Sequence, residues 1–131
     1  MQSLIGIPYR FNGREMTGAD CLGLVQMYLA TQDIHESFSD GNPIEPKWYE
    51  IHQYRLVKYL CRHYKRIKNP EAIRKNDIVL FEINGEGHLG VAIDDYKRIL
   101  STFPGNHSFI IRLTTGKSFF ISGFRNRKDG D

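Results

Sequence analysis

Two residues of this sequence, Cys21 and His88, have the types and the surroundings that thiol chemistry needs. Cys21 follows Thr17-Gly18-Ala19-Asp20, which offers N-cap residues, and it opens an apolar stretch. At a helix start, free backbone N–H groups favour the thiolate, so we expect a pKa below the ordinary thiol value of about 8.5. His88 follows the turn Gly85-Glu86-Gly87 and opens an apolar run, where an imidazole could take the thiol proton.

Both residues also have a plainer interpretation. Cys21 would serve equally well as a small buried hydrophobe that opens a core helix, and His88 as an ordinary loop histidine. Gly18 and Gly23 favour the catalytic interpretation, because glycine allows close approach of backbone or substrate. An acidic neighbour, Asp20, would be unusual beside an inert core cysteine.

The remaining cysteine and most of the histidines are interpreted as structural or surface residues. Cys61 lies beside the apolar stripe of a basic helix and is expected to pack there, while His35, His52 and His63 are expected at the surface. Neither cysteine belongs to a CxxC motif or a metal-ligand cluster. We therefore expect reduced thiols, no disulfide framework, no metal and no cofactor.

The elements that must position Cys21 and His88 follow from periodicity. A short buried helix is expected over Cys21–Ala30, a loop over 36–46, and a second helix from about Lys47 to Arg66. The tail 125–131 is expected to be frayed. From Asn76 onward the periodicity becomes strand-like and predicts five strands: Asp77–Ile83, His88–Ile93, Arg98–Thr102, Phe109–Leu113 and Ser118–Ile121. Helices followed by a meander of strands indicate an α+β fold with a curled antiparallel sheet.

Bulk composition bounds the class of protein. The 131 residues suit a single domain over 1–131, and 40% apolar with 25% charged residues is ordinary globular composition. The sequence has no long apolar run, and its start lacks the features of a signal peptide, so we expect a soluble protein without membrane partners. The basic stretch 47–68 could bind a polyanion such as nucleic acid or teichoic acid. A solvated basic face is the preferred interpretation, and nucleic acid is not expected.

Four segments together resemble the NlpC-type cysteine peptidases. In order they are Pro8-Tyr9 followed by Gly13, Asp20-Cys21-Leu22-Gly23-Leu24, Asn76-Asp77-Ile78-Val79-Leu80-Phe81, and His88-Leu89-Gly90-Val91-Ala92-Ile93. The resemblance spans roughly residues 4–125. It implies a circularly permuted papain-like fold that hydrolyses peptide bonds in bacterial peptidoglycan stem peptides, often at a D-glutamyl–diamino-acid linkage. It also maps the nucleophile onto Cys21 and the base onto His88, and it leads us to assign Tyr9 and Asp20 to substrate binding.

The long insertion after the cysteine helix and the ending Gly123-Phe124-Arg125 look most like the phage-tail branch of that family. The resemblance therefore implies a phage or prophage tail-associated protein, cytoplasmic or virion-associated, that acts at the bacterial cell wall. Peptidoglycan peptides and phage tail proteins are the partners it implies.

The sequence departs from the family pattern at the third catalytic position. Relatives carry a polar residue, usually His, after the strand that follows the base, whereas this chain reads Arg98-Ile99-Leu100-Ser101-Thr102. We assign the third role to Ser101, because pairing across the hairpin should bring Ser101 or Leu100 opposite His88. If Leu100 is opposite, then water, a backbone carbonyl or His107 must take that role. This weak position supports an alternative function, a catalytically weak or inactive tail or wall-binding module with the same fold.

Overall fold

The computed structural model describes residues 4–10, 13–35, 53–83, 86–102, 105, 107–113 and 120–126. Two helices lie in these ranges, α1 (Cys21–Thr31) and α3 (Gln53–His63), with a short 3₁₀ turn, η2 (Pro70–Ala72). No helix in the described part of the chain is long and apolar enough to span a membrane.

Most of the strands form one antiparallel sheet. A small hairpin, β1 (Arg14–Glu15) with β2 (Gly18–Ala19), precedes α1. The larger sheet has the order β3-β8-β4-β5-β6-β7, and every described pairing in it is antiparallel. Its strands are β3 (Tyr64–Ile67), β4 (Ile78–Ile83), β5 (Glu86–Ala92), β6 (Arg98–Ser101), β7 (Phe109–Arg112) and β8 (Phe120–Asn126).

The α+β prediction is confirmed, but the sheet has six strands instead of five. The sixth strand, β3, comes from the end of the predicted second helix, which ends at His63 rather than Arg66. The apolar residues Tyr64 and Ile67 are three apart, a spacing that fits a helix stripe, and both are buried when the segment pairs with β8. The start of that helix and the loop 36–46 lie outside the described residues.

Strand β8 also changes the predicted topology. The meander prediction holds for β4 to β7, whereas β8 returns to lie between β3 and β4. It continues to Asn126, so its last two residues are paired with β3 and are not part of a frayed tail. Burial explains the difference, because Arg125 is only 8% exposed.

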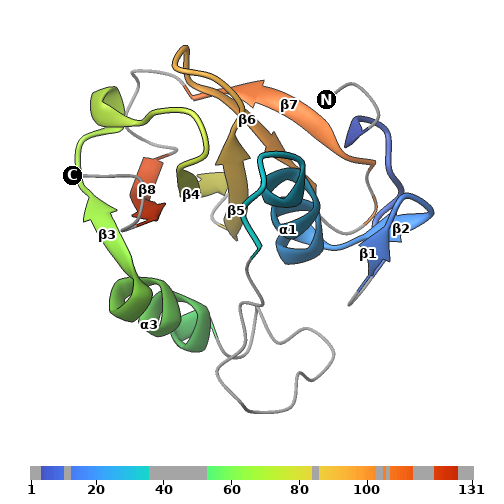
Figure 1. Cartoon of the computed structure of the whole chain (residues 1–131), viewed down its shortest axis with the longest axis horizontal. Coiled ribbons are helices and arrows are strands. Elements are labelled where there is room, and N and C mark those ends of the chain that lie inside the picture. The colour runs from blue at the N-terminus through green and yellow to red at the C-terminus, as the bar shows by residue number, and fades with distance from the viewer. Residues whose placement is uncertain are drawn as a thin grey trace.

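The sheet has an apolar cluster on each face. Helix α1 packs against β5 and β6 on one face, where its residues Leu22, Val25 and Tyr28 join Leu89, Val91 and Leu100 (Figure 1). The opposite face carries the second cluster: Ile67, Ile73, Val79, Phe81, Ala92, Ile99 and Leu113. Helix α3 contacts β3 and β8 at the β3 edge of the sheet, and its Leu56 and Leu60 belong to the same cluster as the α1 residues. Cys61 on α3 is exposed, so its predicted packing role is wrong.

Candidate active site

The candidate site forms where the pairing between β5 and β6 stops. Directly after β5, Ile93 donates its N–H to the Arg98 carbonyl, and within β5 Val91 lies opposite Leu100. Alternate residues therefore direct their backbone groups toward β6. By this alternation Leu89 also faces β6, but β6 ends at Ser101. Two other groups bond Leu89 instead. The Ser101 hydroxyl donates to the Leu89 carbonyl at 2.7 Å, and the Leu89 N–H bonds the Cys21 sulfur.

These contacts place Cys21, the first residue of α1, against the middle of the sheet. Burial and the neighbouring Asp20 carboxylate raise the pKa of the thiol from 9.0 to about 12. Backbone hydrogen bonds from Leu22, Leu89 and Cys21 itself act in the opposite direction and are outweighed. The expected pKa below the ordinary value is therefore wrong, because helix-end N–H groups cannot offset desolvation together with a like charge.

His88 lies next to Leu89 on β5, but its side chain starts from the other face of the strand. It pairs with Phe81, and the two rings lie 5.9 Å apart. Phe81 belongs to the second cluster, opposite α1. The imidazole is only half-buried at this position. The Leu89 N–H, which bonds the Cys21 sulfur, belongs to the residue directly after His88, so the structure brings Cys21 beside the His88–Leu89 segment.

The predicted register of Ser101 is wrong. Ser101 lies opposite Gly90 and Leu100 opposite Val91, so neither faces His88. The strand can approach this closely because Gly90 has no side chain: an added Cβ would lie 2.5 Å from the Ile99 side chain and 2.7 Å from the Leu100 carbonyl. Ser101 is fully buried and its hydroxyl bonds Leu89, which suits a residue that fixes the strand more than one that orients the imidazole.

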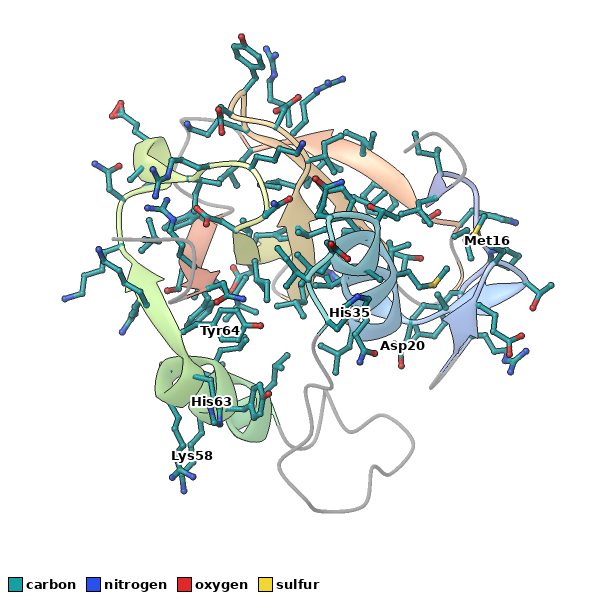
Figure 2. All side chains as sticks on the ribbon, in the orientation of Figure 1. Met16, Asp20, His35, Lys58, His63 and Tyr64 are labelled. Carbon is teal, nitrogen blue, oxygen red and sulfur yellow. The ribbon has the colours of Figure 1, made fainter. Side chains whose placement is uncertain are left out.

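Asp20 and Tyr9 lie at the N-terminal end of α1. The Asp20 carboxylate accepts the Gly23 N–H at 2.7 Å and is the N-cap (Figure 2). Its side chain is buried, so the assignment to substrate binding stays a prediction that this geometry does not favour. Tyr9 is half-buried and bridges to Ala19, two residues before Cys21. The structure thus brings the Pro8-Tyr9 segment close in space to Cys21.

The alternative third residue, His107, also lies beside this segment. It is exposed, and its backbone forms an isolated bridge to Pro8. Ser108 fastens the two segments, because its hydroxyl accepts the Ile7 N–H at 2.7 Å and donates to the Leu4 carbonyl at 2.6 Å. Among the described residues, no group of three or more His, Cys, Asp or Glu side chains is placed to hold a metal ion.

The residue that sequence reasoning missed is Leu89, whose contribution is its backbone. An apolar residue after a histidine carries no signal of such a role. The glycine that follows it does, since Gly90 permits the close approach of β6 that places the Ser101 hydroxyl on the Leu89 carbonyl.

A separate polar centre lies at the other end of β5. There Asp77 forms a two-point ion pair with Arg125, with Nε at 2.9 Å and Nη2 at 2.7 Å from its oxygens. A hollow of about 230 Å³ surrounds the pair and is lined by Arg74, Lys75, Asn76, Asp77, Asp95 and Arg125. Ala92 donates its N–H to the Asp77 carbonyl, and it lies four positions after His88, a span of about 13 Å along the strand.

Comparisons with known proteins bear on the fold and the family of this chain. The fold is similar to the crystal structure of the NlpC/p60 domain of the peptidoglycan hydrolase SagA, with a TM-score of 0.60 and 15% sequence identity. The similarity covers 94% of this chain and 90% of that one. Among curated proteins, none matches the chain. In sequence, residues 6–122 match the NlpC/P60 family, which is a family of cysteine peptidases and amidases. The chain therefore belongs to the NlpC/P60 family.

Proposed function

We propose that this protein is a cysteine hydrolase, an endopeptidase or amidase, that cleaves peptide bonds in bacterial peptidoglycan stem peptides. One observation carries the proposal: the Cys21 sulfur, at the start of α1, is bonded by the Leu89 N–H directly after His88. Family membership and the likeness to the SagA domain, itself from a peptidoglycan hydrolase, support the choice of substrate.

The raised thiol pKa defines what the mechanism requires. With a pKa of about 12, roughly one Cys21 in 10⁵ is ionised at pH 7, so a base must remove the proton as the sulfur attacks. In our proposal His88 is that base. His88 starts from the face of β5 opposite α1, so this role requires the imidazole to reach the sulfur past the end of β6, which stops at Ser101.

The start of α1 also supplies groups for the developing oxyanion. The Gly23 N–H is taken by the Asp20 carboxylate, and Leu24 donates to the Asp20 carbonyl. The N–H groups of Cys21 and Leu22 point toward the sulfur and are the donors we assign to the tetrahedral intermediate.

In this scheme Ser101 is a positioning residue. Its hydroxyl holds the Leu89 carbonyl, so Leu89 keeps its N–H aimed at the sulfur. The role of orienting the imidazole passes to water, a backbone carbonyl or His107, as the alternatives in the sequence allow.

The biological setting that we propose is a phage or prophage tail, with the protein acting at the wall from a cytoplasmic or virion-associated position. The length of chain between α1 and β4 and the ending Gly123-Phe124-Arg125 support it. The second candidate, a wall-binding module with weak or no catalysis, is favoured by the thiol pKa of about 12.

One experiment separates the two candidates. Wild-type protein is incubated with purified muropeptides, and the products are identified by mass spectrometry. We expect cleavage by the wild type and a loss of at least about 10⁴-fold in rate for Cys21→Ala and for His88→Ala.

Cys61→Ala is the matched control, because Cys61 is exposed on α3, and it should keep full activity. Neither active-site variant should lose more than about 1.5 kcal/mol of unfolding free energy. If Cys21→Ala unfolds the protein, Cys21 is a core residue; if wild type cleaves none of the muropeptides, the binding-module function replaces the enzyme.

A further inference from the structure

Positive charge is concentrated in one short stretch of the chain. Residues 53–68 contain six of the eighteen Lys and Arg residues and none of the fifteen Asp and Glu residues. The rest of the chain, with twelve cations and fifteen anions, therefore has a formal net charge of −3, although the whole chain has +3. Protein surfaces ordinarily intersperse the two signs, so this segregation needs a physical reason.

The structure gathers these charges on the surface of α3 and β3. We call the exposed basic side chains there the α3–β3 basic surface: Lys58, Arg62, His63, Lys65, Arg66 and Lys68. Helix α3 lies apart from α1, next to the edge strand β3 (Figure 1), and Lys58 extends from it away from the body of the molecule (Figure 2).

The apolar residues of α3 fix this orientation. Leu56 and Leu60 are buried and direct one side of the helix inward, which leaves Lys58 and Arg62, one turn apart, on the exposed side. The charges then continue along β3 to Lys68. On β3 the neighbouring cations Lys65 and Arg66 extend from opposite faces of the edge strand. The cations are therefore spread along the length of α3 and β3, which suits an extended polyanion better than a single phosphate.

Three cations of this surface, Lys58, Arg62 and Lys68, belong to none of the ion pairs that the structure describes. The ion pairs that the structure describes lie elsewhere, at Asp77–Arg125, Asp94–Arg98 and Asp33–His35. In the part of the chain that the structure describes, no carboxylate pairs with Lys58, Arg62 or Lys68.

Two structural reasons account for some of the charges but not all. Cations in the last turn of a helix interact favourably with the helix dipole, and this explains Arg62 and His63. Charged residues on an edge strand, lysine above all, prevent pairing with other chains, and this explains Lys65 and Arg66 on β3. Lys58 lies in the middle of α3 and Lys68 follows β3, so neither reason applies to them.

We infer that the α3–β3 basic surface binds a teichoic acid, a linear phosphodiester polymer of the bacterial wall, and so holds the domain near peptidoglycan. The choice of a wall polymer rests on the proposed function. The described aromatic residues favour it over nucleic acid, because binding of bases uses exposed rings. Tyr64 is buried, and the half-buried Tyr59 ring lies 4.5 Å from His63.

The test measures binding of fluorescently labelled, purified teichoic acid by anisotropy between about 50 and 200 mM salt. Lys58→Gln/Arg62→Gln removes two charges from the surface. Lys75→Gln/Arg112→Gln removes two exposed charges elsewhere and is the matched control. We expect the Kd to rise roughly tenfold for the first variant and less than twofold for the second, with a shallower salt dependence only in the first.

Equal weakening in both variants, or in neither, would overturn the inference, and so would single-stranded DNA of matched charge binding as tightly as teichoic acid. Cleavage of small soluble muropeptides is measured in parallel and should be unchanged in Lys58→Gln/Arg62→Gln. Cleavage without polymer binding refutes this inference alone, whereas polymer binding without cleavage refutes the proposed function alone.

Discussion

Two buried carboxylates, Asp77 and Asp20, illustrate two uses of charge in this fold. Both lie at the start of an element, β4 and α1, and both are at most 3% exposed. Asp77 lies against the Arg125 guanidinium, which bonds both of its oxygens, and it also accepts the Arg74 N–H. Asp20 accepts a backbone N–H, and its charge raises the pKa of the adjacent Cys21 thiol.

The difference shows where a buried charge stabilises the fold and where it adjusts chemistry. The Arg125 guanidinium, 2.7 Å from the Asp77 carboxylate, offsets much of its negative charge. The ion pair links β4 to β8, and a hydrogen bond from Arg125 to the Ala72 carbonyl links both to η2. The negative charge of Asp20 instead raises the pKa of Cys21, the residue that we propose as the nucleophile. We therefore expect changes at Asp77 to alter stability and changes at Asp20 to alter reactivity.

The largest effect is expected for Arg125→Met. It leaves the Asp77 carboxylate buried without its guanidinium, which should lower the unfolding free energy by about 3–5 kcal/mol in a denaturant titration. Asp77→Asn/Arg125→Met, which removes the charge as well, should recover a substantial part. Muropeptide cleavage by the remaining folded protein should be unchanged. A loss of less than about 1 kcal/mol would show that the pair does not stabilise β4 against β8.

Ser101→Ala should have the next largest effect. It removes the hydroxyl that holds the Leu89 carbonyl, and we expect a loss on the order of tenfold in kcat, or about 1.4 kcal/mol of transition-state stabilisation. A positioning role predicts that KM changes little, that alkylation of Cys21 slows in parallel, and that Ser101→Thr restores part of both. Full activity in Ser101→Ala together with a loss in His107→Ala would transfer the third role to His107.

The elements predicted correctly from the sequence are those whose residue pattern fits only one type of secondary structure. Four strands, from β4 to β7, agree with their predicted ranges to within two residues, because alternation defines them and connections that contain Gly, Asn, Asp or Pro bound them. The left-handed conformation of Asn76, with φ of 75°, also fits its place in the motif, since asparagine tolerates positive φ. Strand β3 was missed because Tyr64 and Ile67 satisfy a helix stripe as well as an edge strand that pairs with β8 far along the chain.

Two features of the site depend on long-range geometry that no local pattern encodes. The facing residue of Ser101 follows from where β5 and β6 begin to pair, and a turn of uncertain length leaves a one-residue shift open. The direction of the Cys21 pKa depends on how deeply α1 packs on β5, which decides whether desolvation exceeds the helix-end N–H groups. The residue types were readable from the sequence, whereas their register and burial were not.

Asp20→Asn tests whether the charge of Asp20 controls the reactivity of Cys21. Asparagine caps a helix about as well as aspartate, so α1 should keep its stability. Removing the negative charge should lower the pKa of Cys21 and raise the thiolate fraction at neutral pH, although burial, the larger cause, still keeps that pKa above its ordinary value.

Brief iodoacetamide labelling with peptide mapping measures this. In the wild type we expect the exposed Cys61 to label first and Cys21 slowly, the reverse of what an ionised Cys21 predicts. In Asp20→Asn the Cys21 rate should rise while the Cys61 rate stays constant. Unchanged labelling of Cys21 would mean that the Asp20 charge does not act on the thiol.

The smallest change in unfolding free energy is expected for Tyr28→Phe. This variant tests whether a buried polar group without a hydrogen-bond partner indicates function. Its hydroxyl is buried in the α1 cluster and, among the described residues, has no hydrogen-bond partner. Burial and the Asp94 carboxylate raise the pKa of Tyr28 from 10.0 to about 12. Removal of an unpartnered hydroxyl should be neutral or stabilising by up to about 1 kcal/mol, so Tyr28→Phe should unfold no more easily than the wild type.

The same residue contributes to the pH dependence of stability, and its sign can be worked out. Because the folded-state pKa exceeds the unfolded value, the folded state holds the proton more tightly. The contribution of Tyr28 is therefore complete below about pH 10 and is lost as the pH rises toward 12. Tyr28→Phe should flatten this decline in denaturant titrations and leave muropeptide cleavage at pH 7 intact. A loss of cleavage would give Tyr28 a role in the site, and the contrast between Asp77 and Asp20 would then no longer suffice to separate structure from chemistry.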